Sequence, residues 1–291
     1  MQKEYNVEAY DAGLWFTGMS AQTNCRVQGN TTQGMYIAGA DGTAYCWKNT
    51  PGISDTLRFM DKGLIVFKKH PPQKVEINKA DVDKPFSTAP KPFTSVIAVY
   101  SRVRPIPAGA DRRNRNVGRD YLWISRDEVR EMLDAARDDG HALVLPATLV
   151  ARLCRFALVD SIRGEPDFWD AKEIKKAAFV LKKIDSKDTQ IRFSFNGDFS
   201  SRTAWYLHGI DGHIDGEFTL DGATEMVSTF RAYAKCKAWG SSEWSTRGVP
   251  QMPFSLVFGF CDEKDPAARA IPPAALSRHQ DYASPKFPVV K

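Results

Sequence analysis

A cluster of arginines is one candidate for a binding function in this sequence. Six arginines surround a segment rich in proline and glycine, SRVRPIPAGADRRNRNVGRD. Guanidinium groups bind phosphates and carboxylates through paired hydrogen bonds. An anionic or protein partner could therefore bind here, although a solvated loop is the simpler interpretation. The loop carries no aromatic side chains that could stack on bases, which disfavours nucleic acid. The candidate residues are Arg102, Arg104, Arg112, Arg113, Arg115 and Arg119.

A second candidate is an acidic row in the segment HGIDGHIDGEFTLD. If 204–220 is a strand, Asp211, His213, Asp215 and Glu217 share one face, because alternate residues of a strand point the same way. Carboxylates and imidazole can bind a divalent cation or act as acid–base groups. The row extends over roughly 20 Å, so one ion could reach only two neighbours without help from another strand. The alternative is the solvated face of an antiparallel strand.

Five cysteines are spaced widely, without a CxxC pair that would indicate a zinc site or a redox motif. Cys25, next to a cation, and Cys46 could form a redox-sensitive pair. Cys154, Cys236 and Cys261 occur in apolar patterns and are expected to be buried in the core.

The segment KAWGSSEWSTRGVPQMPF contains a third candidate. Trp239, Trp244 and Arg247 could line a ligand cleft, since tryptophan supplies apolar area and one hydrogen-bond donor. The alternative is a long hairpin connection whose tryptophans close one end of a sheet.

Motifs typical of enzymes are absent. The sequence contains no G-x-S-x-G, no P-loop, no H-E-x-x-H and no paired C-x-x-C. We therefore expect no cofactor and lean towards a protein without catalytic activity.

Composition narrows the class of protein further. The 291 residues are 43% hydrophobic, 26% charged and 11% aromatic, with a net charge of +5, which is typical of a globular protein. No apolar run approaches the roughly 18 residues that a membrane span needs, so we expect no membrane association. The N-terminal segment shows no signal-peptide pattern, which predicts a cytoplasmic protein and leaves secretion open. A homo-oligomer is compatible with this composition.

The elements divide at a linker. Five prolines stand between residues 70 and 92, which disfavours helix and central strand, so 73–92 is predicted to separate a unit at 1–72 from one at 93–291. In the first unit, strands flank a turn at 40–42, and an amphipathic helix follows, with Ser54 as its N-cap. The apolar residues at helical spacing on this helix are Leu57, Met60, Leu64 and Phe67.

The second unit is predicted to be mostly β. Two helices, 126–137 and about 146–163, are expected among seven strands, with Pro146 at the start of the second helix. Short polar connections favour an antiparallel barrel-like or sandwich domain, so the chain is α+β. The expected strands are 93–103, 119–125, 175–184, 189–199, 204–220, 228–239 and 253–261.

Several of these segments resemble a known family. The hairpin and helix at 33–69 look like the last third of a thioredoxin fold. NTTQGMYIAGADG, NVGRDYLWISRDEV, LVARLCRFALVDSIRGEPDFW, FRAYAKCKAWG and PFSLVFGF occur in the order found in thioredoxin-like proteins of planctomycete-type bacteria. The resemblance covers about two-thirds of the chain and implies a truncated thioredoxin-like unit followed by a domain of unknown function. It implies no activity, and the sequence departs from a redox thioredoxin in lacking the CxxC motif.

These observations favour a non-catalytic binding or assembly protein. One alternative is a thiol- or metal-dependent redox protein that uses Cys25 and Cys46. A weaker alternative is a small-ligand carrier, in which the sheet encloses an apolar pocket.

Overall fold

A computed structural model describes most of the chain as two compact units, 1–85 and 86–291. The predicted linker, apart from residue 73, lies outside the described residues, and so does the turn at 40–42. The described residues are 35–39, 43–48, 52–73, 93–105, 115–137, 143–162, 168–203, 207–240, 253–269, 271, 273–277, 282–283 and 285.

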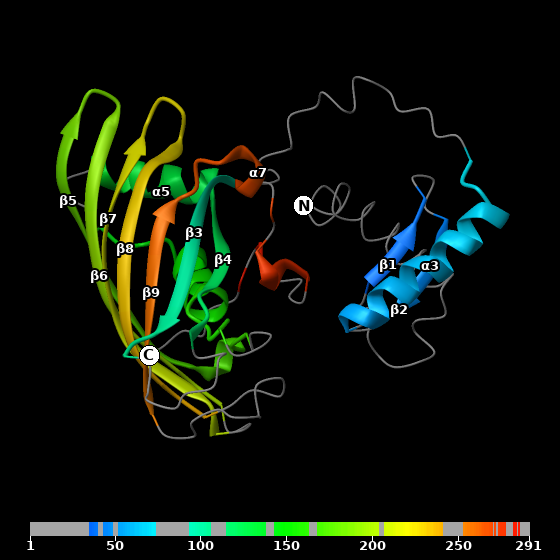
Figure 1. Cartoon of the computed structure of the whole chain (residues 1–291). Helices are drawn as coiled ribbons and strands as arrows, with labels where there is room; N and C mark the ends of the chain where they lie inside the picture. The colour runs from blue at the N-terminus through cyan, green and yellow to red at the C-terminus, as the bar shows by residue number, and fades with distance from the viewer. Residues whose placement is uncertain are drawn as a thin grey trace. The chain divides into compact units, whose positions relative to one another are not determined.

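The first unit contains the predicted hairpin and helix. Strands β1 (Met35–Ala38) and β2 (Ala44–Lys48) pair antiparallel, and α3 (Ile53–Lys69) packs against β2 (Figure 1, blue and cyan). The N-cap is Gly52, without a side-chain cap, rather than the predicted Ser54. Assignment of this unit to the thioredoxin fold remains a prediction.

Of the four residues predicted to form the apolar face of α3, Phe67 packs on the hairpin, with its ring 5.5 Å from that of Tyr45, whereas the other three are exposed. Phe59 is buried, whereas Leu57 and Met60 are 64% and 53% exposed. The reason is a close approach at Gly63, where an added Cβ would lie 2.7 Å from the side chain of Ile37. The glycine therefore lets the helix approach the hairpin closely, and Leu57 and Met60 stay outside this contact.

The second unit is built on one antiparallel sheet of seven strands, in the order β4-β3-β9-β8-β7-β6-β5 (Figure 1). β4 and β5 are edge strands that do not pair with each other, so the predicted barrel is wrong: the sheet stays open. The described strands of this unit also form one sheet rather than a sandwich, because helices cover the inner face. The strands are β3 (Phe93–Val103), β4 (Gly118–Ser125), β5 (Ile174–Lys187), β6 (Gln190–Arg202), β7 (Gly209–Asp221), β8 (Met226–Trp239) and β9 (Phe254–Asp262).

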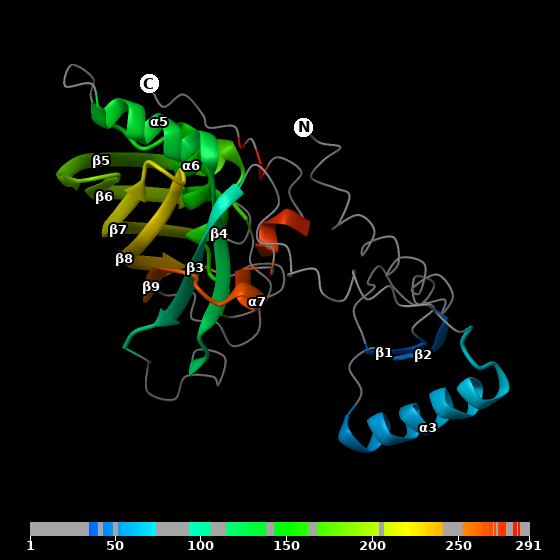
Figure 2. The same ribbon diagram turned by 90° about the horizontal axis from the view of Figure 1, so that it is seen from above.

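Two helical segments lie on one face of this sheet, which we call the inner face (Figure 2). α5 (Arg126–Arg137) has the predicted bounds. The second helix is shorter than predicted: α6 (Ala147–Arg152) continues as a π-helical turn, Leu153–Ala157, and ends there. α7 (Pro266–Arg269) and short 3-10 turns at Ala171–Glu173 and Ala274–Ser277 complete the described helices. None of the described helices combines the length and apolarity needed to cross a membrane.

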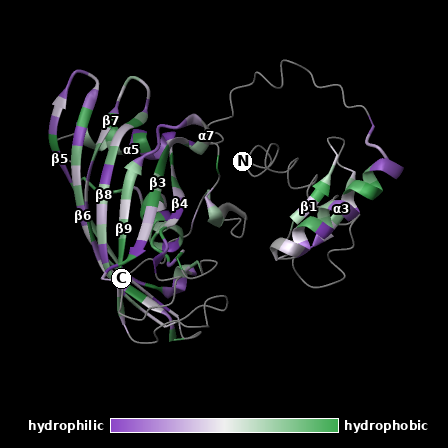
Figure 3. Cartoon of the chain, viewed as in Figure 1, coloured by the Kyte–Doolittle hydropathy of each residue, from purple (hydrophilic) through white to green (hydrophobic). Residues whose placement is uncertain are grey.

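The core lies between the inner face and these helices. Hydrophobic and hydrophilic residues alternate along the strands (Figure 3), and the apolar set packs inward. On β7, for example, Ile210, Ile214 and Phe218 are buried, and the polar residues between them point outward, as predicted. The polar set defines the outer face, on which the candidate site residues lie.

Candidate anion-binding surface

The strand β8 presents a row of cations on the outer face. Arg231, Tyr233, Lys235 and Lys237 are exposed, whereas the residues between them are buried or half-buried. The period-two pattern is visible in the sequence RAYAKCK. Sequence reasoning missed it as a binding row, because charge alone does not distinguish such a row from an ordinary solvated strand face.

The sheet order places Arg102 of β3 two strands from this row, across β9. Arg102 is opposite Val257 of β9, and Val257 is opposite Lys235 of β8. Since neighbouring strands lie about 4.8 Å apart, the backbones of Arg102 and Lys235 are separated by about 10 Å. We call Arg102, Arg231, Lys235 and Lys237 the cation strip.

Neighbouring carboxylates form no ion pair with the cation strip among the described residues. Asp211 and Glu217 of β7 lie opposite β8 cations in the register. Their carboxylates instead contact Arg202 at 3.4 Å and Arg192 at 2.6 Å, both on β6. Among the described residues, no carboxylate lies within 4.0 Å of a cation-strip nitrogen. The strip is therefore available to an external anion.

An open depression of about 530 Å³ lies beside Lys235 and Lys237. Its lining also includes Asp211, Pro253, Phe254 and Ser255, from β7, β9 and the residue before β9. The two lysines thus border an open depression at β7, β8 and β9, whose lining also includes the carboxylate-bearing Asp211.

The six arginines predicted to bind an anion do not form a single cluster among the described residues. Arg102 joins the cation strip, and Arg104 and Arg115 are exposed near the two ends of the connection between β3 and β4. The backbone N–H of Arg104 donates to the carbonyl of Ser255 at 3.1 Å, which fixes this end of the connection beside β9. Arg112 and Arg113 lie outside the described residues.

Arg119 of β4 is already engaged. Its guanidinium contacts the carboxylate of Glu263 at 2.8 Å and lies over the rings of Tyr100 and Tyr121, 5.6 and 5.4 Å from their centroids. This arginine therefore supports an aromatic side chain on the outer face rather than offering a free charge.

The acidic row forms ion pairs with its neighbours. His213 Nδ1 lies 2.6 Å from Asp198 Oδ1, and His213 Nε2 lies 3.3 Å from Asp215 Oδ1. The hydrogen bond to Asp198 is the main reason that the pKa of His213 is raised above its ordinary value. The pKa of Asp198 is lowered, first by its hydrogen bond from Lys176 at 2.8 Å and then by the one with His213.

This pairing does not favour a metal site. An imidazole must be neutral to bind a metal, whereas the carboxylates at both nitrogens of His213 favour its protonated form. Within the part of the chain that the structure describes, no group of three or more potential ligands could hold a metal ion.

The described cysteines lack the environment of a reactive thiol. Cys25 lies outside the described residues, and burial raises the pKa of Cys46. Cys154 and Cys236 are buried, as expected, with strongly raised pKa values. Cys261 is only half-buried on the outer face of β9, so its predicted core position is wrong, and its pKa is also raised by burial. Reactive thiols require a lowered pKa.

Trp239 packs on the sheet. Its ring covers Gly209 on β7, where an added Cβ would lie 2.1 Å from the indole, and Arg202 lies 5.6 Å from the ring centroid. Trp244 and Arg247 lie outside the described residues. Of the three residues predicted to line a ligand cleft, the structure therefore describes only Trp239, and its ring packs on Gly209.

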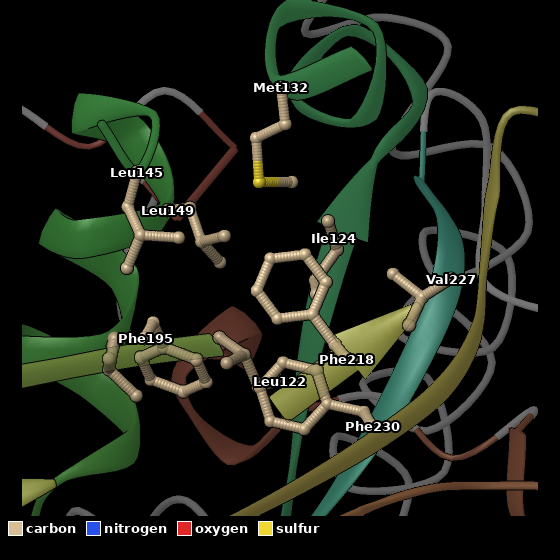
Figure 4. A pocket seen from close by; sticks show the side chains of 10 residues that line it. Leu122, Ile124, Met132, Leu145, Leu149, Phe195, Phe218, Val227 and Phe230 are labelled. Carbon is tan, nitrogen blue, oxygen red and sulfur yellow. The ribbon is translucent and has the colours of Figure 1, made fainter. Parts of the chain in front are cut away.

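A small apolar cavity lies between the inner face and the helices, where Met132, Phe218 and Phe230 point towards a common space (Figure 4). Its volume is about 20 Å³, with no polar lining. Ligand pockets usually measure about 300–1,000 Å³, so this cavity does not favour the small-ligand carrier.

Comparison of the chain with models of protein families, with curated proteins and with solved structures found no match.

Proposed function

We propose that this protein is a non-catalytic binding protein that captures an anionic partner on the outer face of its seven-stranded sheet. The observation that carries the proposal is the cation strip: Arg231, Lys235 and Lys237 are exposed, Arg102 is half-buried, and none of the four pairs with a carboxylate among the described residues. Arg104 and Arg115 extend the positive charge towards the connection between β3 and β4. Desolvation of such a surface is favourable only when a partner supplies the opposite charge.

The other candidate functions have less support. A redox role would need a thiol with a lowered pKa, and the pKa of Cys46 is raised. The hairpin and helix of the first unit are compatible with the thioredoxin-like resemblance, which we retain as part of the proposal in a structural role. Helix α3 supports such a role, since its exposed apolar side chains Leu57 and Met60 offer an assembly surface.

Retention of the purified protein on immobilised heparin, a polyanion, tests the proposal. We expect the variant Lys235→Ala/Lys237→Ala to elute at a clearly lower salt concentration than the unmodified protein. With two fewer cationic contacts, binding releases fewer counterions from heparin and is therefore weaker. The matched control is Lys182→Ala/Lys187→Ala, which removes the same charge from β5, three strands away. Equal effects of the two variants, or no retention at all, would contradict a specific site.

A further inference from the structure

We infer that the anionic partner is single-stranded nucleic acid and that one of its bases enters a slot between Tyr100 and Tyr233. This inference rests on the proposed function and names the partner of the same surface. It departs from the expectation that nucleic acid is disfavoured, since aromatic side chains absent from the arginine-rich loop are present on the strands beside it.

The slot follows from the register of three neighbouring strands. Tyr100 of β3 and Tyr233 of β8 are both opposite Gly259 of β9, so the two tyrosines lie in one row with a glycine between them. A Cβ built on Gly259 would meet no described atom within 4 Å. The outer face is thus open between the two tyrosines, and the glycine forms its floor.

The side chains around the slot leave room for a flat ring. The other outward residues of β9 are small: Ser255, Val257 and Cys261. The backbones of β3 and β8 are two strand spacings apart, about 9–10 Å, which exceeds the roughly 7 Å needed for a ring stacked between two others. The low floor along β9 therefore separates two aromatic walls.

The two walls differ in their support. Tyr233 is 52% exposed, so its ring is accessible. Tyr100 is half-buried, and the guanidinium of Arg119 lies over its ring. Since Glu263 holds that guanidinium, Tyr100 is a fixed platform, and Tyr233 is the more adjustable one.

Cations lie along both walls of the slot, and one carboxylate, that of Asp215 on β7, lies opposite Tyr233. Arg231 and Lys235 flank Tyr233 at two residues on either side, about 6–7 Å along the strand, and Arg102 lies at the same spacing from Tyr100. Alternation of aromatic platforms with cations is typical of proteins that bind single strands, in which bases stack and phosphates pair with cations. An acidic protein surface would use the cations but would leave the slot empty.

A fluorescein-labelled 20-nucleotide oligothymidylate, titrated with the full chain and followed by anisotropy, tests the inference. The variant Gly259→Val fills the slot, and it is compatible with folding because the position is open and valine favours strands. We expect it to weaken oligonucleotide binding at least tenfold, and Tyr233→Ala to weaken binding about 5- to 150-fold. The matched control Ser194→Val, at an outward position of β6 three strands from β9, should leave binding unchanged.

Heparin retention and salt dependence separate the inference from the proposed function. Gly259→Val should keep its retention on heparin, whereas Lys235→Ala should reduce the slope of log K against log salt for the oligonucleotide by about 0.7. If Gly259→Val and Tyr233→Ala bind the oligonucleotide like the unmodified chain, the slot is overturned while the cation strip stands. Binding of polyglutamate in preference to the oligonucleotide would identify an acidic protein partner instead. If the protein bound neither the oligonucleotide nor polyglutamate and was not retained on heparin, the proposed function would be overturned too.

Discussion

The side chain of Arg152 is buried at the edge of the core, where a charge needs several partners. It is 1% exposed and pairs with the carboxylate of Glu128, which also accepts a hydrogen bond from Thr148. A second guanidinium nitrogen donates to the carbonyl of Trp123 at 3.3 Å, and the ring of Tyr282 lies 5.7 Å from the guanidinium carbon. Burial of such a pair is stable only while both partners are present, because desolvating a single charge costs several kcal/mol.

We expect Glu128→Gln to lower the free energy of unfolding by about 3–5 kcal/mol, since it leaves the guanidinium of Arg152 buried without its counter-charge. The double variant Glu128→Gln/Arg152→Met should lose less than the sum of the two single variants, and urea denaturation measures all three. The control Asp134→Ala removes an exposed pair with Arg137 and should change stability by no more than about 0.5 kcal/mol. Additive losses in the double variant would show that the pair does not act as a unit.

At the scale of the elements, side chains connect neighbouring segments at two places. Ser125 and Glu128 form reciprocal hydrogen bonds between side chains and backbone at the start of α5, at 3.2 and 2.9 Å. This is the capping-box pattern, and S-x-x-E is readable in the sequence. On the outer face, Lys176, Asp198 and His213 link β5, β6 and β7, a contact that only the strand register reveals.

The imidazole of His213 should titrate above its ordinary pKa of about 6.5, because Asp198 holds the protonated form. Its contribution to stability is therefore present below that pH and is lost as pH rises through the folded-state pKa. In Asp198→Asn the pKa should fall back towards the ordinary value, as followed by NMR of the imidazole protons. Asp185→Asn, which contacts Arg192, should leave it unchanged. If the pKa of His213 were the same in Asp198→Asn as in the unmodified protein, the pairing of His213 with Asp198 would be refuted.

At the scale of the whole molecule, the sequence predicts the helices and strands better than it predicts which strands pair with each other. Runs of β-prone residues correctly predicted seven strands, although the strand predicted at 204–220 begins at Gly209, and alternation along it correctly predicted the inward side of Phe218. These patterns could not show that β9 pairs with β3 as well as β8, because the residues of that pairing lie more than 150 positions apart and only packing decides it. Since this pairing places Arg102 two strands from Lys235 and leaves Gly259 between two tyrosines, the candidate site was predictable only for single residues such as Arg102.

The packing of the sheet against its helices can be tested at the cavity. Val227 lines the cavity, so Val227→Ile should place a methyl group there and raise the free energy of unfolding by about 0.5–1 kcal/mol. Val129 of α5 is buried in the same core but does not line the cavity. There Val129→Ile should overpack and lower stability by about 1–3 kcal/mol. Urea denaturation of both variants measures the difference, and a loss at Val227 as large as that at Val129 would mean that the sheet and helices leave no usable space.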